Sequence, residues 1–232
     1  MADNGIEIEG LVFEAGAGRS DDSLVDARSR AVTPALTEDD LALDRSLRPK
    51  RLGDYLGQTK IKESLAILIG AAQARGDVVD HILFSGPPGL GKTMVACGLG
   101  LQAVNSGYTV CFEKMTNLIK ILDTAETERA AGFRLKNIKK AQLVIIDEIG
   151  YTPISRGQAN RFFTFISDTY ETSSIIFTTN KEIVDWAEMM GDPVLTTAML
   201  DRILHHAKCY SFRGESYRLK HPDLYPQGDA GM

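Results

Sequence analysis

The sequence predicts an α/β fold in which five largely parallel strands form one sheet flanked by helices. Short apolar runs of strand length alternate along the chain with segments whose apolar residues recur at helical spacing, and this alternation is typical of parallel sheets with helical crossovers. The first apolar run leads directly into a glycine-rich turn, GPPGLGKT. A later run, LVIID, is almost wholly apolar, as expected of a central strand that is buried on both faces.

The first part of the chain is predicted to form a helix, a strand, a turn and a second helix. The apolar residues of the first helix recur at helical spacing: Ile61, Leu65, Leu68 and Ile69. The ARGD sequence of residues 74–77 ends this helix. A strand over residues 81–85 then enters the glycine-rich turn, and the next helix is predicted over residues 92–105.

The alternation continues to residue 212 without an internal repeat. Further strands are predicted over residues 109–113, 143–147, 174–179 and 209–212. Helices are predicted around residues 118–122, over 126–136, from residue 156 onward, and around 183–190 and 195–206. Trp186 is expected in the core or at an interface.

The composition excludes several classes of protein. The 232 residues are 44% hydrophobic and 25% charged, which is typical of one globular domain. No apolar run approaches 18 residues, so we expect no membrane span, and the acidic N-terminus lacks the features of a secretory signal. The three cysteines are an odd number and widely spaced, which favours reduced thiols in a cytoplasmic protein.

Charge is distributed unevenly along the chain. Residues 1–44 hold eleven acidic and three basic residues, a net charge of −8, whereas the remainder has a net charge of +3. We expect an acidic, flexible N-terminal tail over residues 1–44, a folded domain over residues 45–220 and a flexible C-terminal tail over residues 221–232. The mildly basic domain is compatible with a nucleic-acid partner but does not demand one.

The turn at residues 86–93 fits the pattern GxxxxGK[ST] and lies between a strand and a helix, the setting that phosphate binding requires. Its glycines allow backbone N–H groups to surround phosphate oxygens, and the helix N-terminus adds partial positive charge. Lys92 is expected to bridge the β- and γ-phosphates, and Thr93 to offer its hydroxyl to Mg²⁺. The alternative, a glycine-rich surface turn that matches by chance, is rare in this setting. The residues expected to contact the nucleotide here are Gly86, Pro87, Pro88, Gly89, Leu90, Gly91, Lys92, Thr93 and Met94.

Two carboxylates follow the apolar run LVII. Asp147 and Glu148 are delivered to the carboxyl edge of the sheet, where the glycine-rich turn also opens. Asp147 is predicted to hold the Mg²⁺ shell, and Glu148 to orient and polarise the attacking water. Alone, an Asp-Glu pair at a strand end is a weak signal, because acidic residues commonly close strands in solvated turns. The pairing with the phosphate loop makes it strong.

Three further polar residues are candidates. Asn180 ends the next buried strand, where it reaches the γ-phosphate or the lytic water, or else caps a helix that starts at Lys181. Arg202 and Arg218 are either surface or ion-paired arginines, the default for a lone arginine, or groups that stabilise charge on a neighbouring subunit's γ-phosphate. The basic run over residues 129–140 is either a solvated helix face or a DNA-facing patch.

The combination of GPPGLGKT, IIDE and TTN on an alternating α/β chain resembles the AAA+ ATPases, a class of P-loop NTPases. Residues from about 94 to 220 resemble the IstB-type transposition helper ATPases, relatives of the DnaC helicase loaders. The stretches that carry this resemblance are VIIDEIGYTPISRGQANRFFTFIS, SIIFTTN, GDPVLTTAMLDRILHHA and RGESYRLK.

The resemblance implies that residues 45–220 are an AAA+ ATPase domain with the strand order 5-1-4-3-2. It also implies ATP at the interfaces of a homo-oligomer, and it assigns a role to each candidate polar residue. Asn180 becomes sensor 1, Arg202 the arginine finger and Arg218 a sensor-2-like residue.

Residues 47–93, LRPKRLGDYLGQTKIKESLAILIGAAQARGDVVDHILFSGPPGLGKT, are similar to the start of the RuvB branch-migration motors. That resemblance places Leu47 and Arg48 beside the adenine or ribose, with Tyr55 as a lining residue. Met94 departs from the family, which has a second Thr there. The chain therefore resembles a chimera joined near the phosphate loop, with neither the helical lid and winged helix of RuvB nor the N-terminal domain of IstB-type proteins.

Three hypotheses follow, in order of preference. The first is an ATP-hydrolysing helper that assembles on double-stranded DNA and regulates a transposase. The second is a RuvB-like branch-migration ATPase or a DnaC-like helicase loader. The third is a nucleotide-binding module without turnover. For all three, the expected cofactors are ATP and Mg²⁺.

Overall fold

The structure is a computed structural model that describes residues 57–75 and 79–217. The chain divides into two units, residues 1–48 and 49–232, and all described residues belong to the second. The predicted tails over residues 1–44 and 221–232 lie outside the described residues. So do four residues singled out above: Leu47, Arg48, Tyr55 and Arg218.

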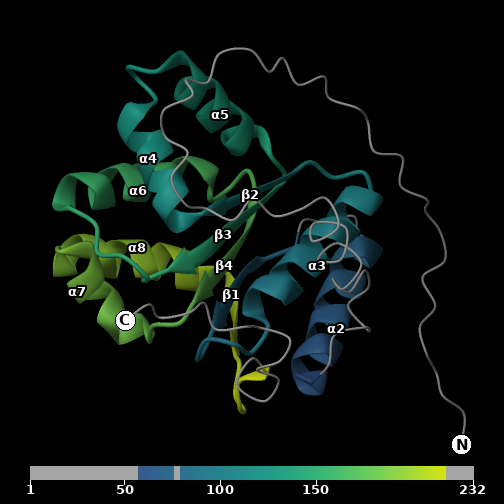
Figure 1. Ribbon diagram of the computed structural model, residues 1–232. Coiled ribbons are helices and arrows are strands. Elements are labelled where there is room, and N and C mark those ends of the chain that lie inside the picture. Colours follow the sequence, from purple (N-terminus) through teal and green to yellow (C-terminus); the bar gives the residue numbers. More distant parts are fainter. Residues whose placement is uncertain (1–56, 76–78, 218–232) are drawn as a thin grey trace, which may run out of the picture. The chain divides into compact units, whose positions relative to one another are not determined.

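Five parallel strands form the sheet of the described residues, in the order β2-β3-β4-β1-β5 (Figure 1). The strands are β1 (His81–Ser85), β2 (Val110–Lys114), β3 (Leu143–Ile149), β4 (Ser174–Thr179) and β5 (Ala207–Ser211). This is the order that the AAA+ resemblance implies, so the predicted sheet is confirmed. Because the strands are parallel, the carboxyl ends of β1, β3 and β4 lie at one edge of the sheet, and the order makes these three strands neighbours.

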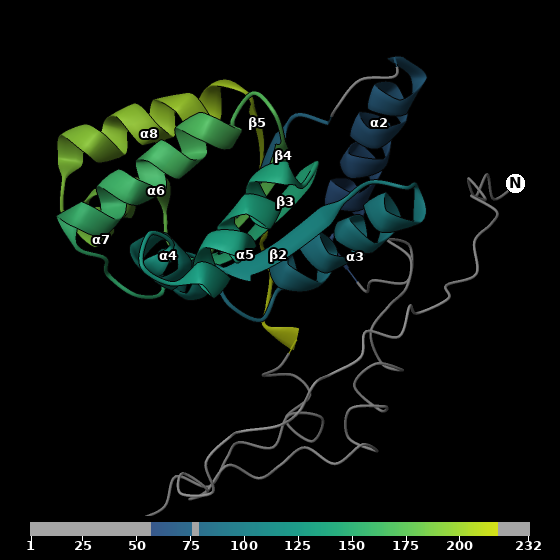
Figure 2. The same cartoon turned by 90° about the horizontal axis from the view of Figure 1, so that it is seen from above.

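Helices cover both faces of the sheet (Figures 1 and 2). On one face lie α2 (Thr59–Arg75) and α3 (Lys92–Asn105). On the other face lie α4 (Met115–Thr124), α5 (Arg129–Lys140), α6 (Arg156–Thr169), α7 (Trp186–Met190) and α8 (Pro193–His205), with the short 3-10 helix η2 (Ile183–Asp185) before α7.

Alternation along each strand divides the apolar core between these two faces. Ile82 and Phe84 of β1 pack with α2 and α3, whereas Leu83 between them packs with the helices of the opposite face. Because both faces are covered, the middle residues of the central strands are apolar on both faces, as the LVIID run predicted. Trp186, expected in the core or at an interface, is fully buried in the core at the start of α7.

Two helix starts are fixed by local chemistry. Ser155 and Gln158 form a capping box before α6, and the carboxylate of Asp192 caps α8, whose first residue is Pro193. The predicted boundaries needed correction at several elements, among them α5 and β5. The helix expected over residues 126–136 is α5, because residues 127 and 128 close a turn onto the Thr124 carbonyl. The last strand, expected over residues 209–212, starts earlier because Ala207 pairs with His81.

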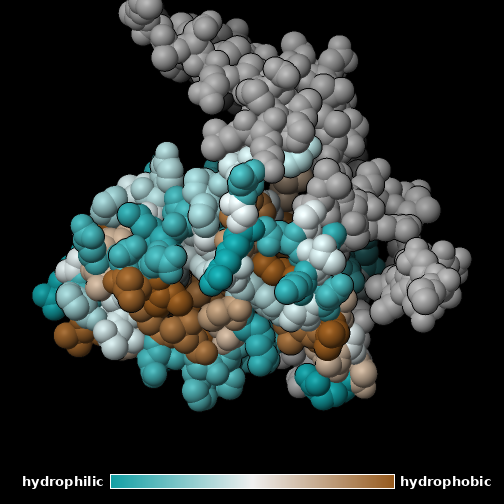
Figure 3. All heavy atoms as spheres, turned by 90° about the horizontal axis from the view of Figure 1, so that it is seen from below, coloured by the Kyte–Doolittle hydropathy of each residue, from teal (hydrophilic) through white to brown (hydrophobic). Residues whose placement is uncertain are grey.

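Several large apolar side chains remain on the surface of the described residues. The exposed fraction is 83% for Val184, 81% for Val194 and 74% for Tyr151. Figure 3 shows apolar patches separated by hydrophilic side chains on the face seen from below. No helix in the described part of the chain combines the length and apolarity that a membrane span needs.

Candidate active site

The glycine-rich turn joins β1 to α3, as predicted. β1 ends at Ser85 and α3 begins at Lys92, with Gly91 at its N-cap. The φ angle of Gly91 is 84°, in the left-handed region that side chains with a Cβ rarely adopt. The turn therefore presents the first backbone N–H groups of α3 toward the carboxyl edge of the sheet, which is the arrangement of an anion site.

Lys92 is folded into the mouth of this turn. Its side chain donates hydrogen bonds to the carbonyl of Gly86 at 2.5 Å and to that of Pro87 at 2.6 Å. The residue is only 8% exposed. Burial lowers the pKa of the Lys92 ammonium, and the nearby Asp147 carboxylate acts in the opposite direction. The cation therefore stands where phosphate oxygens would enter the loop.

Asp147 lies at the centre of a hydroxyl-carboxylate network. It is 1% exposed, and its Oδ1 accepts hydrogen bonds from Thr93 Oγ1 at 2.9 Å and from Thr178 Oγ1 at 2.6 Å. Three separate elements contribute to this contact: α3, β3 and β4. The structure thus brings together the predicted pair of Thr93 and Asp147, and it adds Thr178.

The residues present fit a bound Mg²⁺ ion. Adjacent ligands of an octahedral Mg²⁺ with bonds of about 2.0–2.1 Å lie about 2.9 Å apart. Thr93 Oγ1 and Asp147 Oδ1 have this separation, and both are oxygen donors of the kind that Mg²⁺ prefers. No cluster of three or more His, Cys, Asp or Glu side chains that could hold a metal occurs among the described residues. The site therefore suits a cation that completes its shell with phosphate and water oxygens.

Glu148 is presented by an irregularity at the end of β3. Its φ angle is 61°, and the register of β3 against β4 shifts between Ile146 and Ile149. The backbone N–H of Glu148 donates to Thr178 Oγ1 at 3.0 Å, so Thr178 holds both carboxylate residues of the motif. The strained backbone turns the Glu148 side chain out of the sheet, where the sequence placed the attacking water.

Lys114 is a site residue that the sequence analysis missed. Its Nζ lies 3.1 Å from Glu148 Oε2, and both side chains are about half exposed. Lys114 ends β2 directly beside Asp147 in the ladder between β2 and β3. The strand was predicted to end one residue earlier. The sequence did offer a signal for this residue, because Lys114 directly follows the strand predicted over residues 109–113.

Asn180 and Arg202 have different surroundings. Asn180 follows β4 directly and is exposed. The alternative that it caps a helix beginning at Lys181 is wrong, because the next helix is η2, with Glu182 at its N-cap. Arg202 points onto α6 of its own chain, where it donates to Ser167 Oγ and its guanidinium lies 5.1 Å from the centre of the Phe163 ring.

The basic run of α5 divides into two groups. Arg134 donates to the Glu113 carboxylate, which is 4% exposed, and Lys139 pairs with Asp168 at 2.7 Å. These two cations join α5 to β2 and α6. The remaining cations of the run, Arg129, Lys136 and Lys140, are exposed. Together with Phe133, which is 68% exposed, they recur at intervals of four, three and four residues and so share one face of the helix.

Residues 67–224 match the family model described as "IstB-like ATP binding protein". The chain belongs to this family. This confirms the predicted IstB resemblance, but the match begins at residue 67, before the phosphate loop, and not at about residue 94 as predicted.

The chain is 45% identical over 141 residues to an insertion sequence IS21 ATP-binding protein of Pseudomonas aeruginosa, covering 61% of this chain and 53% of that protein. It is 41% identical over 148 residues to the IS5376 counterpart of Geobacillus stearothermophilus, covering 64% and 59%. The chain thus spans about half the length of the curated relatives that it matches.

A similarity to RuvB is also found, over a longer stretch than residues 47–93, for which it was predicted. The chain is 37% identical over 140 residues to a RuvB 2 branch-migration subunit of a Synechococcus strain, which covers 60% of this chain and 35% of that protein.

The solved structures confirm the predicted AAA+ fold. DnaI has a TM-score of 0.61 at 17% identity, covering 75% of this chain and 93% of DnaI. DnaA from Aquifex aeolicus has a TM-score of 0.58 at 14% identity, covering 75% of this chain and 54% of DnaA. At such identities the likeness concerns the fold alone.

Proposed function

We propose that this protein binds ATP with Mg²⁺, hydrolyses it, and serves the transposition of an insertion sequence on double-stranded DNA. The observation that carries the proposal is the meeting of Thr93, Asp147 and Thr178 beside the phosphate loop, with Glu148 next to them. Membership of a family whose relatives are named as ATP-binding proteins of insertion sequences gives the biological setting. We expect this activity in the cytoplasm, because the sequence pattern of the cysteines favours reduced thiols.

Each residue of the site has a role in this proposal. Lys92 leaves the carbonyls of Gly86 and Pro87 to hold the β- and γ-phosphates. Thr93 and Asp147 hold Mg²⁺, which when bound neutralises charge on the phosphates. Glu148 orients the attacking water and accepts its proton. Asn180, at the same edge of the sheet, orients that water or the γ-phosphate.

The test is the Glu148→Gln variant. An amide keeps the size of the carboxylate but accepts no proton, so hydrolysis is expected to fall by about a hundredfold or more. ATP affinity is expected to stay within about twofold, because the phosphate loop is untouched. Turnover by this variant at the wild-type rate would remove Glu148 from the mechanism. ATP binding by the wild type without hydrolysis at any protein concentration would favour the nucleotide-binding module.

The DNA part of the proposal is supported by the exposed stripe of α5. Arg129, Phe133, Lys136 and Lys140 share one helix face, and the charges of this stripe complement a phosphate backbone. The two other cations of α5, Arg134 and Lys139, are partly exposed but are paired with the carboxylates of Glu113 and Asp168. We therefore assign duplex binding to the stripe and not to the whole basic run.

The ATP hydrolysis rate with and without DNA tests this part. The rate is measured at fixed low salt, since phosphate contacts are screened strongly, with no DNA, with linear duplex and with a four-way junction. Stimulation by linear duplex is expected for a transposition helper. A preference for the four-way junction would favour the RuvB-like alternative, which the similarity to the RuvB 2 subunit supports.

The partner proteins belong to the same proposal. Homo-oligomerisation with ATP at subunit interfaces is proposed from the family resemblance. Arg202 acts in this assembly as the arginine finger and Arg218 as a sensor-2-like residue, both by family resemblance. The DNA-bound partner is a transposase, as expected for a helper encoded with an insertion sequence.

A further inference from the structure

After β5 the chain continues along the phosphate loop. Phe212 N donates to the carbonyl of Ser85 at 2.8 Å, which extends the pairing of β1 with β5 by one residue. The Phe212 side chain is fully buried, with its ring 5.3 Å from that of Phe84. We call residues 212–217 the β5 extension. Its first residue is thus anchored in the core beside the start of the loop.

The β5 extension contacts the phosphate loop at two glycines. Tyr217 N donates to the Gly89 carbonyl at 3.0 Å. A Cβ atom at Gly89 would overlap Ser216 Oγ, and a Cβ atom at Gly86 would overlap the carbonyl oxygen of Phe212. The two segments therefore pack closely, with the backbone of Phe212 against Gly86 and the side chain of Ser216 against Gly89.

Gly91 provides a contrast within the same loop. Its φ angle of 84° is close to the 79° of Gly89, so a side chain would strain the backbone similarly at both positions. A Cβ atom at Gly91, however, would meet nothing within 4 Å. Gly91 is therefore required for its backbone conformation, whereas Gly89 is required for its conformation and for contact with Ser216.

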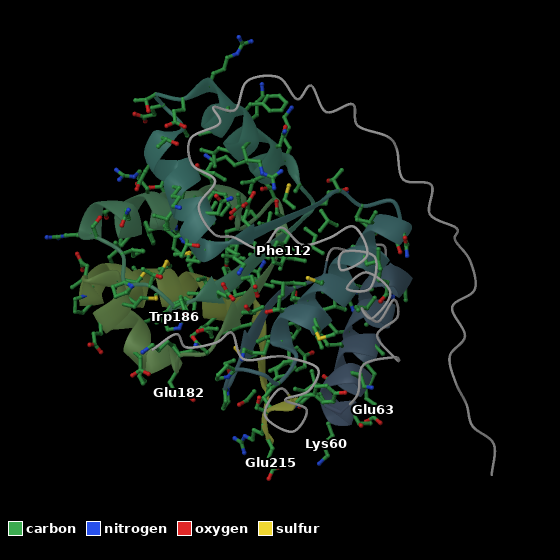
Figure 4. All side chains as sticks on the ribbon, in the orientation of Figure 1. Lys60, Glu63, Phe112, Glu182, Trp186 and Glu215 are labelled. Atoms are coloured by element: carbon green, nitrogen blue, oxygen red, sulfur yellow. The ribbon has the colours of Figure 1, made fainter. Side chains whose placement is uncertain are left out.

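A second element holds the extension from its other side. Gln58 Nε2 donates to the Arg213 carbonyl of the extension at 3.0 Å, and in β5, just before the extension, the hydroxyl of Tyr210 lies 3.3 Å from Ser64 Oγ. Both contacts come from the chain at the start of α2. Figure 4 shows Lys60 of α2 and Glu215 of the extension at the same end of the sheet. The extension is thus fixed between the start of α2 and the phosphate loop.

The carbonyl groups of the loop have two kinds of partner. Those of Gly86 and Pro87 accept from Lys92, the side chain that must turn to the phosphates when ATP binds. The carbonyl of Gly89 accepts from the backbone N–H of Tyr217, which does not have to turn to the phosphates when ATP binds. The contact at Gly89 is therefore available with or without nucleotide, and it fixes the direction of the peptide group there.

We propose that the β5 extension preorganises the phosphate loop for ATP, with the backbone N–H of Tyr217 as the positioning group that acts through the Gly89 carbonyl and with Ser216 packed against the same glycine. The inference rests on the proposed function, because ATP is taken as the ligand of the loop. Preorganisation lowers the ordering cost of binding. The Tyr217 N–H does not touch the reacting atoms, so its loss is expected to raise KM for ATP and to leave kcat nearly unchanged.

The first experiment compares Gly89→Ala with Gly91→Ala, each alone and combined with Ser216→Gly. ATP affinity is measured by calorimetry with Mg²⁺, KM and kcat by steady-state hydrolysis, and the folded state by thermal unfolding. Gly89→Ala is expected to weaken ATP binding by about tenfold or more, the effect of roughly 1.4 kcal/mol. Adding Ser216→Gly removes the overlap and is expected to restore most of that loss.

Gly91→Ala is the matched control. The backbone strain in Gly91→Ala is of the same kind as in Gly89→Ala, but Ser216 does not contact residue 91. Ser216→Gly is therefore expected to give no recovery of ATP affinity in the Gly91→Ala protein. Equal recovery in both backgrounds, or none with Gly89→Ala, would overturn the proposal. A wild-type protein that binds no ATP would overturn the proposed function itself, and this result is distinct from a failure of the recovery.

The second experiment leaves the loop sequence intact. Tyr217→Pro removes the N–H that the Gly89 carbonyl accepts, and Tyr217→Ala keeps it while removing the same ring. The expected result is a several-fold higher KM for the proline variant than for the alanine variant, with equal kcat. Equal KM values for the two variants would show that the backbone hydrogen bond does not position the loop.

Discussion

Lys114 and Glu148 form an ion pair across the carboxyl edge of the sheet, with Nζ 3.1 Å from Oε2. Lys114 ends β2, and Glu148 lies just after the residue that Lys114 faces in β3. The residue before Lys114, Glu113, accepts from Arg134 of α5. A short path of contacts thus runs from α5, whose outer face carries the basic stripe, to the carboxylate that we expect to activate water.

Lys114→Ala is predicted to raise the basal rate of ATP hydrolysis. The ion pair draws Glu148 toward β2, and its removal frees the carboxylate to reach the water. Exposed ion pairs contribute up to about 1 kcal/mol, so the increase is limited to about fivefold. The measurement is kcat without DNA. Lys120→Ala, which removes an exposed lysine of α4, is the control and should leave kcat unchanged. A lower kcat for Lys114→Ala would show that the pair serves catalysis directly.

Thr178→Val is predicted to lower both stability and activity. The variant leaves the buried Asp147 with one donor fewer and the backbone N–H of Glu148 without its acceptor. An unsatisfied buried group costs about 1–3 kcal/mol of unfolding free energy, which urea titration measures. Hydrolysis is expected to fall by about tenfold, with a higher Mg²⁺ requirement. Thr178→Ser, which keeps the hydroxyl, should behave like the wild type; similar losses in both variants would point to packing instead.

The sequence predicted the strands and helices of the fold and the residues that the structure brings together at the centre of the candidate site. Local patterns identified Lys92, Thr93, Asp147 and Glu148 because strand, turn and helix signals fix where each side chain emerges. The order of the strands was not in these patterns. It came from family resemblance, because pairing between distant strands depends on packing over the whole sheet.

Contacts between distant segments could not be predicted from the sequence. Thr178 was seen only as part of a polar strand end, and its bonds to Asp147 and Glu148 depend on the register of β3 with β4. The glycines of the phosphate loop were explained by phosphate contact alone. The packing of Ser216 on Gly89 joins residues more than 120 positions apart, and no local signal reports it.

His81 is predicted to make the stability of the domain depend on pH. Its Nδ1 accepts from the backbone of Ile175 at 3.1 Å, which holds the ring neutral at the start of β1. Burial lowers the pKa of His81 below its ordinary value of 6.5, and the charge of His206 acts in the same direction, whereas a backbone hydrogen bond to Tyr170 and the charge of Asp80 act against it. The unfolded state therefore binds a proton more readily than the folded state.

The direction of the pH dependence follows from this difference in the pKa of His81 between the folded and the unfolded state. The contribution of His81 is fully present above the unfolded pKa and is lost as the pH falls through 6.5 toward the folded value. Urea unfolding at pH 7.5 and pH 5.5 is expected to show lower stability at the acidic pH. His81→Asn keeps an acceptor near Ile175 but does not titrate, so the difference between the two pH values should shrink. If the difference in stability between pH 7.5 and pH 5.5 is unchanged in His81→Asn, the pH dependence belongs to other groups.

Arg202→Ala is predicted to abolish hydrolysis without weakening ATP binding by the single subunit. If Arg202 acts on the neighbouring subunit's γ-phosphate, its removal costs about a thousandfold in kcat, whereas the phosphate loop of its own chain is unaffected. The structure holds this arginine against Ser167 and the ring of Phe163, so it must leave α6 in order to act. Ser167→Ala removes one of these contacts and keeps the arginine, so hydrolysis should persist or rise.

Mixing subunits separates action between chains from action within one chain. Arg202→Ala keeps Glu148, and Glu148→Gln keeps Arg202, so a mixed oligomer contains interfaces with both groups intact. Recovery of hydrolysis on mixing is expected, because the arginine of one subunit then completes the site of the other. Full hydrolysis by Arg202→Ala alone would show instead that the contact with α6 is the whole role of this side chain.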